Sequence, residues 1–245
     1  MLTKNRKKLI KSLQQKKYRD AHGLFLVEGE KMVKEALSSN ISAVGFEVES
    51  VYALLSLEDQ FPSATIISDE DMQSITALKN HSGVLAVIKQ STQDAEFWNS
   101  LHANVLVLDD IKDPGNLGTI IRSAEWFGIK EIIVSPYTVE WYNPKAVQST
   151  MGSIFRVKLR KESLTDALPK LHDNGYTSYA ADMGGTSIQK VNWASKKALI
   201  VGSEAHGLSD EVKELAQHKV HIEGKGNAES LNAGVATAII LSHWS

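Results

Sequence analysis

The chain of 245 residues contains no cysteine. It therefore has no disulfide framework, no thiolate nucleophile and no zinc or iron–sulfur site with cysteine ligands. It also lacks a long apolar run, because no stretch approaches the roughly 18 apolar residues that a membrane-spanning helix needs. At the N-terminus, Leu9 and Ile10 are followed at once by Lys11, so the apolar core of a secretory signal is missing too. These absences predict a soluble, cytoplasmic protein.

Two familiar phosphate-binding loops are absent as well. Neither a G-x-G-x-x-G nor a G-x-x-x-x-G-K-[ST] pattern occurs, so a dinucleotide-binding or P-loop enzyme lacks its main sequence signal. His218 and His221 lie three residues apart but have no evident third ligand. We interpret them as ordinary polar residues, and the sequence predicts no metal site.

What the chain does have is a polarised distribution of charge. Its 27 Lys and Arg and 29 Asp and Glu give a formal net charge of −2, which taken alone argues against a nucleic-acid partner. Residues 1–19, however, hold no acidic residue and eight basic ones: Lys4, Arg6, Lys7, Lys8, Lys11, Lys16, Lys17 and Arg19. The other 226 residues contain 19 basic and 29 acidic side chains and carry a formal charge of −10. Such a basic segment is either a solvated helix face or a phosphate-binding surface.

The upstream part of the chain alternates short apolar runs with helix-forming stretches. A basic helix is predicted over about 3–17, and a second helix is predicted to open at 28–30 and to continue through Leu37. The strand candidates of this part are 24–27, 43–48, 64–67 and 83–88. The alternation predicts a small α/β domain over residues 1–90, followed by a polar linker over 91–103.

The downstream part, residues 104–245, alternates more clearly. Its strand candidates are 105–108, 131–134, 176–181 and 198–201. One helix is predicted to end at Phe127, and others are predicted near 162–174, 209–217 and 230–243. Several strands are near-continuous apolar runs, as expected for parallel strands covered on both faces. This pattern predicts an α/β domain with a parallel sheet.

The first candidate site follows the strand 105–108. Residues 113–116 suit a tight turn in which Asn116 caps the next helix, and Arg122 lies six residues further on, in its second turn. The arginine would then lie close to the carboxyl edge of the sheet, where open α/β sheets bind ligands. Taken alone, the segment is also compatible with an ordinary strand–turn–helix connection that carries a surface arginine.

Two further loops have a similar arrangement. Residues 202–204 (Gly-Ser-Glu) follow the strand 198–201, and residues 230–232 (Ser-Leu-Asn) open the last predicted helix. Small residues in that helix permit the close approach of another backbone. Taken singly, Glu204 is compatible with a solvated loop carboxylate and Ser230 with a simple helix cap.

In their order and spacing, these motifs closely resemble those of the SpoU (TrmH-like) RNA 2′-O-ribose methyltransferases of the SPOUT superfamily. The matching patterns are Asn116-x-Gly118-x-x-x-Arg122, Gly202-Ser203-Glu204-x-x-Gly207-Leu208 and Ser230-Leu231-Asn232. Residues 149–155 also resemble the family's Ser-x-Gly-Ala-x-Phe segment. Upstream, residues 25–36 resemble the family's N-terminal substrate-binding domain, which has a ribosomal-protein-like α/β fold.

The resemblance implies a parallel-sheet catalytic domain with a deep trefoil knot, a homodimer, and S-adenosyl-L-methionine bound within the knot. The cofactor-binding residues that it implies by position are Ala181 or Asp182, Gly202, Ile222 and Leu231, which would act mainly through backbone groups. The chain departs from the family's common pattern at 222–224, where Ile-Glu-Gly replaces Ile-Pro-Met, and at 233–234, where Ala-Gly replaces Val-Ser.

The implied reaction is an in-line attack of a ribose 2′-oxygen of RNA on the sulfonium methyl group. The catalytic residues that the resemblance implies are Asn116, Arg122, Glu204, Ser230 and Asn232. Because a guanidinium stays protonated, we assign Arg122 to the phosphate beside the target ribose and to the developing alkoxide, not to proton removal. The other four residues would orient it.

The RNA partner is expected to be ribosomal RNA, because the upstream domain resembles that of the rRNA-acting branch. Transfer RNA is the alternative substrate. A non-catalytic RNA-binding protein of the same fold and an unrelated nucleotide-binding enzyme are the alternative functions. Phosphate contacts are predicted for Lys4, Arg6, Lys7, Lys8, Lys11 and Arg19.

Overall fold

The chain forms two compact units in a computed structural model that describes residues 2–38, 41–91, 97–102 and 104–244. Unit 1 consists of Met1–Gln93 and Glu140–Arg156, and unit 2 consists of Asp94–Val139 and Val157–Ser245. Residues 140–156, predicted as part of the downstream domain, therefore belong to unit 1. Much of the predicted linker, residues 92–96 and 103, lies outside the described residues. None of the described helices has both the length and the apolar character needed to cross a bilayer.

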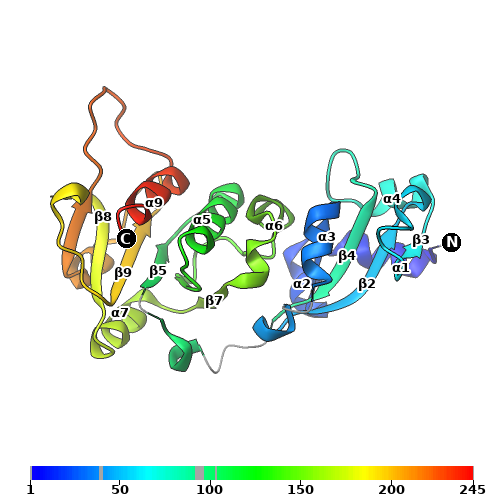
Figure 1. The fold of residues 1–245 in the computed structure, drawn as a ribbon, viewed down its shortest axis with the longest axis horizontal. Coiled ribbons are helices and arrows are strands. Elements are labelled where there is room, and N and C mark those ends of the chain that lie inside the picture. Colours follow the sequence, from blue (N-terminus) through cyan, green and yellow to red (C-terminus); the bar gives the residue numbers. More distant parts are fainter. Residues whose placement is uncertain (1, 39–40, 92–96, 103, 245) are drawn as a thin grey trace. The chain divides into compact units, whose positions relative to one another are not determined.

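Unit 1 contains a four-stranded mixed sheet (Figure 1). Its order is β1 (Leu24–Glu28), β4 (Val84–Lys89), β2 (Glu47–Ala53) and β3 (Thr65–Ile66). The pairs β1–β4 and β2–β4 are antiparallel, and β2–β3 is parallel. The helices of this unit are α1 (Lys4–Ser12), α2 (Lys16–His22), α3 (Glu30–Ala36), α4 (Asp69–Ile75) and α6 (Pro144–Thr150).

Two predicted elements of unit 1 differ from the structure. The predicted helix 3–17 is divided into α1 and α2, because the chain leaves the first helix at Leu13, whose side chain is fully buried with Ile10. The predicted strand 43–48 begins only at Glu47, after a 3₁₀ turn over Ile41–Val44. The strand continues to Ala53 because its last three residues are buried and pair with β4.

Both faces of the sheet in unit 1 are covered by apolar side chains. Leu24 and Leu26 of β1 point into a core that contains Ile10, Met72 and Leu85. The residue between them, Phe25, points to the other face, as the alternation of a strand requires. There its ring lies 4.6 Å from that of Tyr142 and 5.8 Å from that of Phe46, and Phe155 contacts Phe46 at 5.4 Å. Residues 140–156 thus supply part of the core of unit 1.

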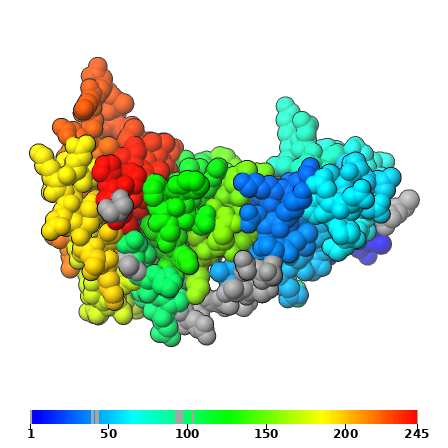
Figure 2. Space-filling view, viewed as in Figure 1, coloured from blue at the N-terminus to red at the C-terminus, as the bar shows by residue number. Residues whose placement is uncertain are grey.

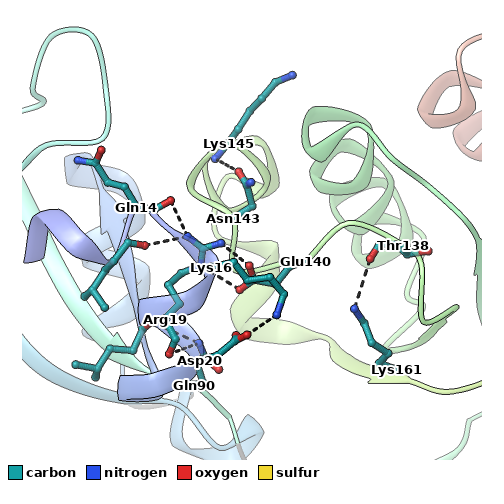
Figure 3. A network of polar contacts seen from close by, with 12 residues as sticks. Gln14, Lys16, Arg19, Asp20, Gln90, Thr138, Glu140, Asn143, Lys145 and Lys161 are labelled. Carbon is teal, nitrogen blue, oxygen red and sulfur yellow. Dashed lines mark hydrogen bonds and ion pairs between the residues drawn. The ribbon is translucent and has the colours of Figure 1, made fainter.

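A buried ion pair ties α2 to the same segment. Arg19 is only 2% exposed, and its guanidinium donates to both carboxylate oxygens of Glu140 (Figure 3). Its Nη1 atom also donates to the backbone oxygens of Leu13 and Gln14, at 2.9 Å each. These bonds satisfy carbonyl groups at the junction of α1 and α2, so Arg19 holds the junction and residue 140 together.

Unit 2 contains a six-stranded sheet in which every pair of neighbours is parallel, which confirms the predicted parallel sheet. Its order is β10 (His218–His221), β8 (Thr177–Ser187), β9 (Lys197–Gly202), β5 (Asn104–Asp109), β6 (Glu131–Val134) and β7 (Lys158–Lys161). The edge strands β7 and β10 were not predicted. Their sequences, KLRK and HKVH, lack an apolar run because an edge strand is not buried on all sides.

Helices cover both faces of this sheet. Val105 and Val107 of β5 pack with α7 (Leu164–Asp173) and α8 (Asp210–Leu215). The other face is covered by α5 (Pro114–Trp126) and α9 (Ala233–Leu241), which lie side by side (Figure 1). A Cβ atom on Gly234 of α9 would lie 3.0 Å from a methyl group of Thr119 in α5. Glycine at position 234 therefore lets α9 pack closely against α5, where the nearest atoms belong to the side chain of Thr119 and not to its backbone.

Candidate active site

A cleft of about 420 Å³ opens in unit 2 beside the middle of β8 and the carboxyl ends of β9 and β10. Part of its wall is the loop between β10 and α9, which projects from the surface (orange in Figure 2). The lining includes every position for which the sequence predicts a cofactor contact: Ala181, Asp182, Gly202, Ile222 and Leu231. Two of the predicted catalytic residues, Glu204 and Ser230, line it too. The fold thus gathers segments that are up to 50 residues apart in the sequence.

The loop that carries Glu204 closes tightly on itself. Ser203 and Gly207 exchange two backbone hydrogen bonds, of 3.1 and 2.9 Å. A Cβ atom on Gly202 would lie 2.3 Å from the carbonyl group of Gly207, a distance that no side chain tolerates. Glycine at position 202 is therefore required by the turn itself, in addition to any contact with a ligand.

A chain of hydrogen bonds joins the three motifs. The side-chain amide of Asn116, on α5, donates to Glu204, in the loop after β9. The side-chain amide of Asn232 donates to Asn116 Oδ1 at 2.9 Å. Asn232 itself is held at the start of α9, where its Oδ1 accepts from the backbone N–H groups of Gly234 and Val235 at 3.0 and 3.3 Å. Each motif thus contributes one side chain to a single polar network.

The predicted cap of α5 is wrong, and the difference explains the network. Asp113, not Asn116, caps α5, and its carboxylate accepts from the backbone N–H of Asn116 at 2.9 Å. This arrangement leaves the side chain of Asn116 free for Glu204. Similarly, Asn232, not Ser230, caps α9. Ser230 therefore lies in the loop and lines the cleft.

Arg122 is placed apart from this network. Since α5 begins at Pro114, Arg122 lies in the third turn of the helix, one turn later than predicted, and its side chain is exposed. Within the described part of the chain it has no hydrogen bond and no ion pair, and it does not line the cleft. The isolated chain thus presents Arg122 as a free cation on the same helix that carries Asn116.

A buried carboxylate that the sequence reasoning missed anchors the Glu204 loop. Asp109, at the end of β5, is 5% exposed and accepts two hydrogen bonds from Ser209, from its backbone N–H at 2.7 Å and from its hydroxyl at 2.9 Å. The available signal was an acidic residue that ends a buried apolar strand, because a buried carboxylate needs partners. The bonds fix one end of the loop to the central strand of the sheet.

The six predicted phosphate-binding residues fall into two groups. Lys4, Lys8 and Lys11 are exposed along one face of α1 and have no ion-pair partner among the described residues. Arg6 instead bonds to Glu49, Tyr52 and Ser50, and Lys7 pairs with the buried Asp71.

The phosphate contact predicted for Arg19 is wrong. Its guanidinium is buried and bonded to Glu140 and to two backbone oxygens, so it has no exposed surface with which to bind a phosphate.

In the described ranges, no group of three or more His, Asp or Glu side chains is placed to hold a metal ion.

Two known protein families match most of the chain. Residues 103–242 match the SpoU rRNA methylase family, and residues 4–86 match the MRM3-like substrate binding domain. The 23S rRNA (guanosine(2553)-2′-O)-methyltransferase RlmP of Bacillus subtilis is 29% identical over 95% of this chain and 93% of its own length. An uncharacterized tRNA/rRNA methyltransferase of Synechocystis is 32% identical over 96% of this chain and 88% of its own length.

Solved structures resemble the whole chain. A putative RNA methyltransferase of the TrmH family from Porphyromonas gingivalis has a TM-score of 0.88 and 29% identity, covering 100% of this chain and 98% of its own. An AdoMet-bound rRNA methyltransferase from Sinorhizobium meliloti has a TM-score of 0.85 and 27% identity, covering 99% and 95%.

Proposed function

Because this chain belongs to the SpoU rRNA methylase family, we propose that it transfers a methyl group from S-adenosyl-L-methionine to a ribose 2′-hydroxyl of ribosomal RNA. The observation that carries this proposal is the network of Asn116, Glu204 and Asn232, which joins all three motifs. The network adjoins the cleft through Glu204, one of the residues that line it. An enzyme that orients a weakly acidic hydroxyl needs such a polar constellation next to its methyl donor.

The residues around the cleft fit S-adenosyl-L-methionine. A volume of about 420 Å³ lies within the range of small-molecule pockets. Apolar side chains of Ile222 and Leu231 suit a flat heterocycle, whereas the carboxylates of Asp182 and Glu223 suit hydroxyl and ammonium groups. When bound, the cofactor supplies an electrophilic methyl group. The tight turn at Gly202 keeps backbone groups at the wall of the cleft, where they can contact the cofactor.

The remaining residues act on the RNA. Arg122, exposed and unpaired among the described residues, binds the phosphate beside the target ribose and stabilises the charge that develops on the 2′-oxygen. Glu204 accepts a hydrogen bond from Asn116 through one carboxylate oxygen, and its other oxygen, which has no partner among the described residues, is available for a substrate hydroxyl. Ser230 lines the cleft, and Asn232 holds Asn116 in position through its hydrogen bond.

Three lysines of α1 form the phosphate-binding surface. Lys4, Lys8 and Lys11 lie four and three residues apart, so they share one helix face, and all three are exposed. Charged contacts of this kind are independent of sequence and sensitive to salt. The name of the Bacillus relative, a 23S rRNA methyltransferase, supports ribosomal over transfer RNA.

We also propose that the protein is a homodimer with a trefoil knot in unit 2. Support for the dimer comes from apolar side chains on the paired helices α5 and α9: Trp126 is 82% exposed and Val235 is 47% exposed. Exposed apolar side chains on neighbouring helices are typical of an interface. Light scattering coupled to gel filtration checks this: Trp126→Glu with Val235→Glu should halve the mass, and a monomeric wild type would refute the dimer.

The test of the main proposal is methyl transfer from tritiated cofactor to ribosomal RNA isolated from cells that lack the gene. Wild-type protein should label this RNA at a 2′-oxygen and should leave RNA from the parent cells unlabelled. Calorimetric titration with S-adenosyl-L-methionine provides the second measurement. Intact RNA binding without cofactor binding would instead favour a non-catalytic RNA-binding protein, and labelling of transfer RNA alone would favour the alternative substrate.

A further inference from the structure

A second cavity, of about 500 Å³, lies at the same carboxyl edge of the sheet in unit 2. It is bordered by the ends of β5 and β6 and by the first turns of α7 and α8. Ser203 and Gly207 line both this cavity and the candidate cofactor cleft. The loop that carries Glu204 is therefore the partition between the two.

We propose that this second cavity binds a nucleobase of the RNA segment that is being methylated, a proposal that rests on the proposed function. A nucleotide whose base enters the cavity meets the Glu204 loop as one wall. The ligand is thereby brought to the loop that also borders the methyl donor. The assignment follows from three features of the lining: its charge, its rim and its floor.

The charge of the lining disfavours a phosphate. Among the described residues that line the cavity there is no lysine and no arginine, and Asp110 and Glu211 are acidic; of these two, Asp110 is paired with Lys112 at 2.5 Å, which leaves Glu211 as the carboxylate open to a ligand. A third carboxylate, that of Asp109, is engaged by Ser209. Carboxylates repel a phosphate but accept hydrogen bonds from the N–H groups of a neutral base. The cavity thus suits a base with N–H donors.

The rim carries an exposed aromatic side chain. Tyr137 is 77% exposed, although its ring is large and apolar. Its backbone is held in place, because Lys112 Nζ donates to the carbonyl oxygen of Tyr137 at 3.0 Å and lies 5.8 Å from the ring centroid. An exposed ring beside a cavity is a platform on which a base stacks.

The cavity also has an apolar floor and a wall that carries hydroxyl groups. Leu164, Leu208 and Val212 are at most 4% exposed and form an apolar floor. The hydroxyl groups of Ser163 and Thr165 lie 2.7 Å from each other at the start of α7. Hydroxyl groups both donate and accept, so they can bond to the edge of a base that the floor and the ring hold by its faces.

The test compares Tyr137→Ala with the matched control Tyr137→Phe. Methyl transfer to ribosomal RNA from cells that lack the gene gives KM for RNA, and calorimetry gives Kd for S-adenosyl-L-methionine. Tyr137→Ala should raise KM for RNA about tenfold because a stacking contact is lost. Tyr137→Phe keeps the ring and should stay within about twofold of wild type, and Kd for the cofactor should be unchanged in both.

A second variant addresses the cavity itself. Thr165→Trp, at an exposed wall position, should also raise KM for RNA without changing Kd for the cofactor or the unfolding temperature. If the wild type labels RNA and both Tyr137→Ala and Thr165→Trp behave like wild type, the base site is refuted while the proposed function stands. If the wild type labels no RNA, the proposed function fails and the base site fails with it.

Discussion

The basic N-terminal segment and the three motif loops of unit 2 respond to folding in opposite ways. In unit 2, folding gathers Asn116, Glu204 and Asn232 from distant segments into one hydrogen-bonded network. In unit 1, folding divides a contiguous basic run: Lys8 and its helix-face neighbours stay exposed, while Arg19 becomes part of the core. The comparison teaches that the charge of a segment does not reveal which of its charges remain available.

The strongest test of this division is Arg19→Met. Removal of the guanidinium leaves the Glu140 carboxylate, only 12% exposed, without its partner, and an uncompensated charge with so little access to water costs up to about 3–5 kcal/mol. We expect a large fall in the unfolding temperature measured by differential scanning calorimetry. Lys8→Met removes an exposed cation from the same segment and should leave that temperature unchanged. Equal unfolding temperatures for the two variants would contradict the structural role of Arg19.

The corresponding test in unit 2 is Arg122→Lys. A lysine keeps the charge but loses the bidentate geometry, and we expect turnover to fall by about 100-fold. Because Arg122 is exposed and unpaired among the described residues, stability and cofactor affinity should not change. The measurements are single-turnover methyl transfer and calorimetric titration. Near wild-type turnover would remove Arg122 from the proposed mechanism.

A smaller effect is expected when Lys4, Lys8 and Lys11 are all replaced by alanine. The slope of log K for RNA against log salt should become shallower by about 2 to 3, since each phosphate contact contributes about 0.7–0.9. Lys16→Ala is the matched control, because Lys16 is already paired with Asp20. Filter binding at several salt concentrations gives the slope. An unchanged slope for the triple variant would show that RNA is held elsewhere.

Deletion of the whole segment would not answer this question. Ile10 and Leu13 are fully buried in the core of unit 1, so removing residues 1–17 would remove part of that core. Point substitutions at exposed lysines separate the loss of charge from the loss of packing.

The smallest effect concerns pH. Burial raises the pKa of the Glu28 carboxyl above its ordinary value of 4.5, although hydrogen bonds from Thr76 and Ala77 act in the other direction. The folded state then binds a proton that the unfolded state has lost, so stability falls as pH rises above 4.5. Glu28→Gln has no carboxyl group to titrate at this position, so it should lose less stability than the wild type between pH 4.5 and pH 7.

Glu49 provides the control of opposite sign for this experiment. Partial burial raises its pKa, but hydrogen bonds from Arg6 and Ser50 outweigh burial and lower it. Its contribution to stability is therefore lost as pH falls below its ordinary value of 4.5. Calorimetry gives the unfolding temperature of each variant across pH 3–7. Relative to wild type, Glu28→Gln should become more stable as pH rises, and Glu49→Gln should become more stable as pH falls. The same trend in both would contradict the assignment.

Much of unit 2 was predictable because its signals are local. The strands β5, β6 and β9 are near-continuous apolar runs, and a parallel strand covered on both faces requires such a run. The edge strands β7 and β10 carry no such run and were missed. The cap of α5 was assigned to Asn116 instead of Asp113 because both are suitable capping types and they lie only three residues apart.

Unit 1 was less predictable because part of it comes from elsewhere in the chain. Tyr142 and Phe155 complete the core around Phe25 and Phe46, across more than 95 residues of sequence. No local pattern distinguishes these aromatic residues from those of a downstream core. The composition of a compact unit depends on which apolar faces meet, and that is a property of the folded chain.

By itself, the sequence determined the parallel sheet, the three motifs and the excess of positive charge in residues 1–19, since each is a pattern of residue types along the chain. Tertiary structure alone decided that Glu204 bonds to Asn116, that Asp109 anchors the loop and that Arg19 is withdrawn from the surface. The physical reason is that a side chain's availability depends on its neighbours in space. A buried charge must be paired, whereas an exposed one is free to bind.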